Sequence, residues 1–438
     1  MIYIKSIGKY TLVFIVTLTI LFSSLAVTSC IPKSAIEENI KESVTLFKEN
    51  SGIEPLITGQ SCSLIHYYAD SILLNIIYCI DSTTPIDSML WSYFYQFIYF
   101  DLNNDFISLV EDDKEPNQEY LRYWHGSMSI IRPLLTILNI EQIYLLNGLL
   151  LFSLAIILFV IIFKRNRKLS IIYAISMLMI AFPIVPFCLE YSWTFYIMLI
   201  TSIIALCIEK QGDNKLNLLF LISGMLTCFL DFLTTELITL FVPLVFVLII
   251  RRQENRLTKF RQGLTLVIKA SVLWSIGYVG MWLAKWVLAS IILGINAMDY
   301  VFSRMKLRIN GVSFLIPYSE MFKDSIGKNL SIVFPLNLIY KYLTLIIIPA
   351  VLGILISLFA DWKNLNKKWF ALLLILIAFT PYLRYLILAN HSFFHSFFTF
   401  RAQIITIIAL IWALTELLDF EKILNIKQKI ITFRKEHM

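Results

Sequence analysis

Long apolar runs recur along the chain and are separated by short polar segments. A helix needs about 20 mostly apolar residues to cross the hydrocarbon core of a bilayer. Runs of suitable length predict about ten transmembrane helices, near residues 9–29, 143–163, 169–188, 192–208, 216–232, 236–250, 265–289, 338–359, 369–388 and 398–417. The pattern therefore predicts an all-α polytopic membrane protein in which residues 1–438 form a single integral membrane domain.

The composition strengthens this prediction. Hydrophobic residues make up 58% of the chain and charged residues 15%, whereas a typical soluble domain has about 25% charged residues. The net charge of +7 comes mostly from Lys and Arg in short loops, where such residues set membrane topology. The sequence has no basic stripe with interleaved aromatic residues and no Gly-rich phosphate loop, so we expect membrane lipid and no nucleic acid as its partner.

Clusters of basic residues follow the second, sixth, eighth and last predicted helices, at residues 164–168, 251–261, 363–368 and 422–435. With ten helices, all these clusters fall on the same side of the membrane. Cytoplasmic loops carry an excess of Lys and Arg, so this side is predicted to be cytoplasmic, with both termini inside. The first apolar run is long enough to act as an uncleaved signal anchor; a cleaved signal peptide is the alternative.

Two longer polar segments, residues 31–142 and 290–337, are predicted to be extracytoplasmic loops. Between Ile31 and Gly126 the first loop contains 15 acidic and 5 basic residues, a net charge of −10. The apolar runs at residues 69–80, 89–100 and 129–138 predict short helices that lie in the plane of the membrane interface.

Asp70 begins one of these interfacial runs and is the candidate general base. Partial desolvation near the membrane surface raises the pKa of a carboxyl group toward neutral pH, which suits proton abstraction. The position also fits a structural role, because a carboxylate at the start of a helix caps its N-terminus and interacts favourably with its dipole. The sequence leaves both interpretations open.

A dense group of residues suited to binding lies near the end of the first loop. Arg122 and Arg132 offer planar forks that match phosphate. Tyr123 and Trp124 offer flat faces for a sugar ring, and His125 forms hydrogen bonds in either protonation state. We predict that all five bind substrate; anchoring at lipid headgroups is the alternative.

Further polar residues lie at the ends of later predicted helices, on the same side. Polar groups near hydrocarbon are costly unless they are paired or used. His391 and His395 share a helix face, but no acid adjoins His391 as in the zinc-protease motif, so no metal site is predicted. The residues predicted to bind substrate here are Glu190, Asp231, His391, His395 and Arg401; structural pairing and interfacial hydrogen bonding are the alternatives.

The order of these features resembles the GT-C superfamily of polytopic glycosyltransferases. The shared pattern is a first helix, a large external loop with interfacial helices and acidic residues, the Arg132-Pro133 turn, and many helices joined by short loops. Segments 122–126 and 390–395 also look like those of an uncharacterised group of bacterial membrane proteins. Superfamily members usually carry an acidic residue or pair early in the first loop, whereas here Glu37-Glu38 looks like part of a solvated helix and Asp70 lies later.

The resemblance implies an enzyme of the bacterial plasma membrane with its site on the extracytoplasmic face. The expected reaction moves a sugar from a polyprenyl-phosphate-linked donor to an extracytoplasmic glycan, lipid or protein acceptor, with Asp70 as the base. No cofactor is expected, and a requirement for a divalent cation stays open.

A non-catalytic transporter, such as a flippase, or an assembly partner for envelope polysaccharide is the alternative function. Transporters tend to show internal repeats and polar groups at mid-membrane depth. This chain has no evident repeat. Lys285, the main charge inside a predicted helix, is expected to extend toward the interface.

Overall fold

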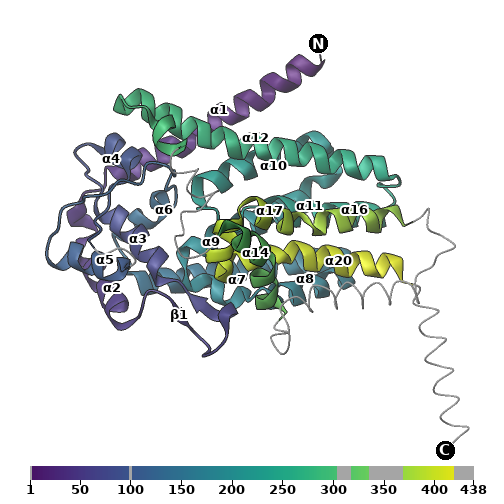
Figure 1. The fold of residues 1–438 in the computed structure, drawn as a ribbon. Helices are drawn as coiled ribbons and strands as arrows, with labels where there is room; N and C mark the ends of the chain where they lie inside the picture. Colours follow the sequence, from purple (N-terminus) through teal and green to yellow (C-terminus); the bar gives the residue numbers. More distant parts are fainter. Residues whose placement is uncertain (1, 98–100, 303–316, 335–367, 419–438) are drawn as a thin grey trace, which may run out of the picture.

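The computed structural model describes residues 2–97, 101–302, 317–334 and 368–418, which fold almost entirely as helices (Figure 1). This confirms the predicted all-α class. A short antiparallel pair, β1 (Glu54–Pro55) with β2 (Leu64–Ile65), accompanies the helices. The predicted helix at 338–359, parts of the 290–337 loop and the basic residues of the tail lie outside the described residues.

In the part of the chain that the structure describes, six helical segments are long and apolar enough to cross a membrane. They are Gly8–Ser29 in α1 (Ile2–Ser29), Ile140–Arg165 (α7), Leu189–Gln211 (α9, Leu189–Ile208, with η4, Glu209–Gln211), Phe260–Leu293 (α12), Trp369–Ile387 (α16, Trp369–Ala378, with α17, Thr380–Ile387) and Ser396–Leu417 (α19, Ser396–Thr399, η6, Phe400–Gln403, and α20, Ile404–Leu417).

The outer faces of these segments are apolar. Along α12, the exposed side chains of Ile268, Val272, Ile276 and Val279 follow one another at intervals of three or four residues, so they lie on one face of the helix. A large exposed apolar surface marks an interaction site for membrane or protein. Together with the length of the helices, this surface indicates a multi-pass membrane protein.

Three further predicted spans, at 169–188, 216–232 and 236–250, lie within the bundle. They correspond to α8 (Arg167–Met179) with η3 (Phe182–Phe187), α10 (Asp213–Leu230) and α11 (Ile238–Gln253). In α11, 14 of the 16 residues are buried. A helix enclosed by its neighbours is apolar on all sides, which explains why its sequence looks like that of a membrane span.

Helices α10 and α12 pack closely enough for their backbones to touch. A Cβ atom at Gly224 would overlap the carbonyl oxygen of Trp274, and a Cβ atom at Gly277 would overlap that of Leu221. Small residues at a helix interface permit this approach, as in many membrane bundles. The two glycines therefore fix how α10 sits against α12.

One end of the bundle is built around the buried carboxylate of Glu209. Its oxygens lie 3.1 Å from Arg165, 3.4 Å from Arg251 and 2.5 Å from Arg256. Arg251 also pairs with Asp213 at 2.6 Å. The basic clusters at 164–168 and 251–261, predicted to share one side, do lie together, and we call this the basic end.

The first predicted loop forms a helical unit at the opposite end of the bundle (Figure 1). Its elements are η1 (Lys33–Ala35), α2 (Glu37–Glu49), η2 (Ser61–Ser63), α3 (Tyr67–Tyr78), α4 (Pro85–Trp91), α5 (Leu102–Glu111) and α6 (Met128–Leu134). Leu74 of α3, Phe47 of α2 and Phe106 of α5 belong to its core, which continues onto Leu25 of α1. We call residues 31–139 the loop unit.

Two of the three interfacial runs are helices, α3 and α6, close to the predicted bounds. The third prediction, 89–100, is wrong over residues 92–97, because α4 ends at Trp91 and Ser92 has φ 51°, and residues 98–100 lie outside the described residues. Phe94 then pairs with Gln118 through backbone hydrogen bonds of 3.0 Å. This pairing gives the backbone of the segment partners outside a helix.

Candidate functional site

The turn between α10 and α11 joins two segments that the sequence predicts to share a site. The Gly126 N–H donates to the Phe229 carbonyl at 2.9 Å, and the His125 ring lies 5.0 Å from that of Phe232. From the other side, Arg384 donates to the Leu233 carbonyl at 2.6 Å. Segments 122–126 and 384–395 are therefore at the same end of the bundle, beside one turn.

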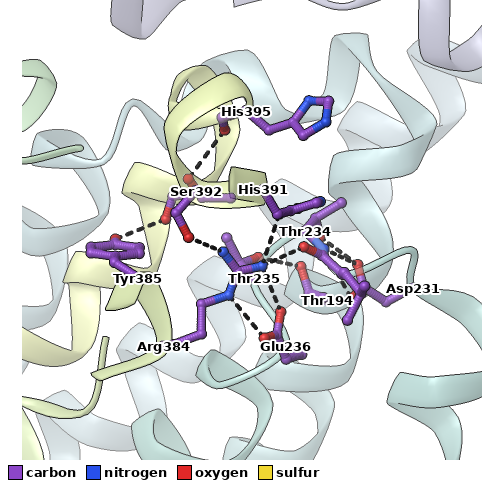
Figure 2. A network of polar contacts seen from close by, with 12 residues as sticks. Thr194, Asp231, Thr234, Thr235, Glu236, Arg384, Tyr385, His391, Ser392 and His395 are labelled. Carbon is purple, nitrogen blue, oxygen red and sulfur yellow. Dashed lines mark hydrogen bonds and ion pairs between the residues drawn. The ribbon is translucent and has the colours of Figure 1, made fainter. Parts of the chain in front are cut away.

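Arg384 organises the C-terminal half of this region (Figure 2). Its guanidinium lies 3.0 Å from the Glu236 carboxylate, 2.9 Å from the Ser392 hydroxyl and 3.4 Å from Nδ1 of His391. Both members of the ion pair are buried. Asp231 accepts bonds from the backbone N–H and the hydroxyl of Thr234, so its carboxylate holds the turn.

Arg384 was not among the sequence candidates. It lies inside the apolar segment Trp369–Ile387, and a charge in such a segment is itself a signal of a functional or paired group. That signal was available from the sequence.

Asp70 is completely buried and caps the N-terminus of α9. Its carboxylate accepts bonds from the Tyr144 hydroxyl at 2.7 Å and from the backbone N–H groups of Leu189 and Glu190 at 2.9 and 3.3 Å. Burial raises the pKa of Asp70 to about 6, and the hydrogen bonds from Tyr144 and from Leu189 and Glu190 oppose this rise. The carboxylate therefore fixes the first turn of α9.

Glu190, in that first turn, has a different environment. Its side chain is partly exposed, and among the described residues its carboxylate accepts no hydrogen bond and forms no ion pair. Its electrostatic neighbours are the carboxylates of Asp70 and Asp231. Glu190 is therefore an acid held in place through its backbone with its side chain left available.

Arg401 is a buried cation without a carboxylate partner in the described part of the chain. Its Nη1 donates to the Phe397 carbonyl at 3.2 Å, and its guanidinium lies 4.7 Å from the ring centroid of Tyr191. Nε and Nη2 have no hydrogen-bond partner there. Donors buried without a partner are costly, and guanidinium groups bind carboxylate and phosphate well.

Ring contacts extend from Arg401 through Tyr191 to His66 and, by way of Phe398, to His391 and His395; we call these residues the Arg401 cluster. His66 stacks on Tyr191 with ring centroids 6.1 Å apart, and it lies 4.9 Å from Phe397. His391 and His395 lie 4.6 Å apart. Burial, with a smaller contribution from His395, lowers the pKa of His66 to about 3, so this ring is neutral.

The segment 122–125 packs against α12 and does not join the Arg401 cluster. The Trp124 indole donates to the Met281 carbonyl at 2.8 Å. Arg122 lies over the rings of Tyr120 and Tyr123 and donates to the Tyr120 hydroxyl at 2.9 Å. Burial lowers the pKa of His125 to about 3.

Arg132 is likewise separate from the Arg401 cluster. Its guanidinium donates to the carbonyl of Ile31 at 2.6 Å and to those of Ile77 and Ile80. Burial lowers its pKa to about 10. Arg132 thus joins the end of α1 to the C-terminus of α3.

The sequence-predicted residues therefore separate into three places. The turn and the Arg401 cluster bring together Asp70, Glu190, Asp231, His391, His395 and Arg401. Arg122, Tyr123, Trp124 and His125 lie on the other flank of the turn, and Arg132 lies between the end of α1 and the C-terminus of α3. Within the described ranges, no three His, Cys, Asp or Glu side chains are grouped so that they could hold a metal ion.

Comparison with known proteins gives no match, whether by protein-family models, curated proteins or solved structures.

Proposed function

We propose that the chain is a membrane glycosyltransferase that moves a sugar from a polyprenyl-phosphate donor to an extracytoplasmic glycan, lipid or protein acceptor. In this proposal ten helices cross the bacterial plasma membrane: the six long segments, α8, α10 and α11, and the predicted helix at 338–359. The basic end faces the cytoplasm with both termini, because Lys and Arg are retained there. The loop unit and the site face outward.

The observation that carries the proposal is the presence of an acid and a cation that both lack partners among the described residues. There, the Glu190 carboxylate accepts no hydrogen bond, and two nitrogens of the buried Arg401 guanidinium have no hydrogen-bond partner. Sugar transfer from a lipid phosphate needs a base for the acceptor hydroxyl and a cation for the leaving phosphate. Both lie at the bundle end where lipid and water meet.

Glu190 and Arg401 each act in one step of the proposed reaction. The acceptor oxygen attacks the anomeric carbon, the bond from that carbon to the phosphate oxygen breaks, and the hydroxyl proton passes to Glu190. Negative charge grows on the departing polyprenyl phosphate, and Arg401 stabilises it. The neutral His66 ring and Tyr191 form the wall of the phosphate site.

Asp70 has a supporting role in this scheme. Its carboxylate binds the N-terminal turn of α9 and so positions Glu190. The sequence-based prediction that Asp70 itself is the base remains a prediction, which the experiment below also tests.

The test uses the full-length protein in lipid nanodiscs with a panel of radiolabelled polyprenyl-phosphate sugars. We expect the wild-type protein to release polyprenyl phosphate from the donor. The Glu190→Gln variant should lose this release but still bind the donor. Arg401→Gln should weaken binding of polyprenyl phosphate, while the basic-end control Arg252→Gln should behave as wild type. If the Glu190→Gln variant still releases polyprenyl phosphate and the Asp70→Asn variant does not, then Asp70 is the base.

A transporter gives a different result in vesicles. It would move the labelled lipid between leaflets without breaking the bond between sugar and phosphate. Such movement by Glu190→Gln at the wild-type rate, with no release by either protein, would overturn the transferase proposal.

A further inference from the structure

A pocket of about 460 Å³ opens in the loop unit, away from the Arg401 cluster. It lies between the C-terminal end of α3, helix α4 and the segment 114–116. Its volume falls within the usual range for small-molecule sites, roughly 300–1,000 Å³. None of the residues discussed so far as catalytic or binding lines it.

Two stacked aromatic rings belong to the lining of this pocket. Trp91 and Tyr93 have ring centroids 5.6 Å apart and an interplanar angle of 22°, so the rings are nearly parallel. Both side chains are partly exposed. A partly exposed aromatic face suits the flat face of a pyranose, whereas a cage for a quaternary ammonium needs several rings arranged around the cation.

The charged groups of the lining favour a ligand that donates hydrogen bonds. Lys33 is engaged by Asp113 at 3.2 Å and lies 4.2 Å from the Tyr78 ring centroid. Lys114 lies 3.9 Å from Asp112.

The carboxylates differ from these lysines. Asp87 and Glu115 line the pocket, are exposed, and have no partner in the part of the chain that the structure describes. The pocket therefore offers free acceptors beside an aromatic face, which matches the hydroxyl groups of a sugar.

Helix α4, which carries Trp91, is attached to the membrane bundle. Helix α4 lies beside α1 and α12 (Figure 1), and the buried Lys285 of α12 donates to the Leu90 carbonyl at 2.9 Å, near the C-terminus of α4. A positive charge near the C-terminus of a helix interacts favourably with the helix dipole. The pocket is thereby held at a fixed place relative to the bundle.

We infer that this pocket binds a saccharide through Trp91, Tyr93 and Asp87. Its assignment as a subsite for the acceptor glycan rests on the proposed function; saccharide binding itself does not. A glycan held here would extend from the loop unit toward the bundle end where transfer is proposed.

The test presents wild-type protein in nanodiscs, free of glycoside detergents, to an array of neutral hexose and N-acetylhexosamine oligosaccharides. The best binder is then titrated by calorimetry. We expect Trp91→Ala and Tyr93→Ala each to weaken binding at least about tenfold, as for a central aromatic anchor. Trp91→Phe should restore most of the affinity, and the control Phe97→Ala, an exposed ring outside the pocket lining, should leave it unchanged.

Three results would overturn the inference. The first is that no array member binds, and the second is that binding survives Trp91→Ala and Tyr93→Ala. The third is that tetramethylammonium, but no saccharide, binds in a Trp91-dependent manner. Glu190→Gln separates this inference from the proposed function, because saccharide binding should persist in that variant whether or not transfer occurs.

Discussion

The contacts of Asp70 predict a specific dependence of stability on pH. Its folded-state pKa is about 6, against an ordinary value of 3.8. Between about pH 4 and pH 6 the folded protein keeps the proton on Asp70 while the unfolded chain loses it. The free energy of unfolding therefore decreases as the pH rises through this window and then stays level with respect to this group.

The size of this decrease in the free energy of unfolding follows from the difference between the two pKa values. At 1.36 kcal/mol per pKa unit, a rise from 3.8 to about 6 corresponds to a loss of about 3 kcal/mol. Asp70→Asn removes the titration and retains a carbonyl oxygen that accepts from the Leu189 N–H. Tyr144→Phe removes the strongest opposing hydrogen bond, so the folded-state pKa should rise further and the window should extend to higher pH.

The assay is thermal unfolding in detergent, followed by Trp fluorescence between pH 4 and pH 8. The measured quantity is the difference in Tm between wild type and variant at each pH, which cancels the other titrating groups. We expect the Tm of Asp70→Asn to increase relative to that of the wild type as the pH rises to 6. Parallel curves at all pH values would refute the view that Asp70 is a buried carboxylate with a raised pKa.

Three further predictions concern packing, the buried ion pair and orientation. Gly277→Ala should destabilise the protein by about 1–3 kcal/mol through overpacking, while Gly327→Ala, which has nothing within 4 Å of a new Cβ, should not; thermal unfolding compares the two. Arg384→Met should cost about 3–5 kcal/mol in the same assay because it leaves a buried carboxylate unpaired, and wild-type stability would contradict the buried pair. In a cysteine-free background, an impermeant thiol reagent should label Thr83→Cys on intact cells but not Lys215→Cys; the reverse pattern would invert the proposed orientation.

Much of the fold is predictable because membrane helices have a simple sequence signal. The apolar runs locate α7, α9, α12 and the two C-terminal segments, and the basic clusters at 164–168 and 251–261 meet at one end as expected. The same signal does not distinguish a lipid-facing helix from one enclosed by protein, since both are apolar. This is why α11 looks like an ordinary span although nearly all of it is buried.

Single residues inside helices are harder to place. Lys285 was expected to extend toward the interface, and this is wrong: it is fully buried and donates to carbonyls at the end of α4. The partner is 195 residues away along the chain, so no local pattern reveals it. Asp70 is similar, because its cap on α9 connects residues that are 119 and 120 positions apart.

The structure brings together part of the set of residues that the sequence predicts to bind substrate. Glu190, His391, His395 and Arg401 were selected as polar residues at segment ends, and the structure gathers them with Asp70 at one end of the bundle. Sequence position could not show which of them are satisfied, because that depends on neighbours brought together by folding. His66, which lies in the long predicted loop 31–142, joins the cluster through its contact with Tyr191, and the separation of these two residues along the chain hides this contact from any local pattern.

Buried charged groups in the bundle differ in whether the folded protein itself supplies their partners. At the basic end the carboxylate of Glu209 is surrounded by three arginines, so the folded protein satisfies that charge by itself. At the opposite end Arg384 is likewise paired with Glu236, whereas two donors of Arg401 have no hydrogen-bond partner among the described residues, although Asp70 and Glu190 belong to the same region. Each unsatisfied buried donor costs about 1–3 kcal/mol, and a direct ion pair would remove that cost. Among the described residues the chain builds such pairs at Glu209 and at Arg384 but not at Arg401, which supports the proposal that an anionic ligand is the partner of Arg401.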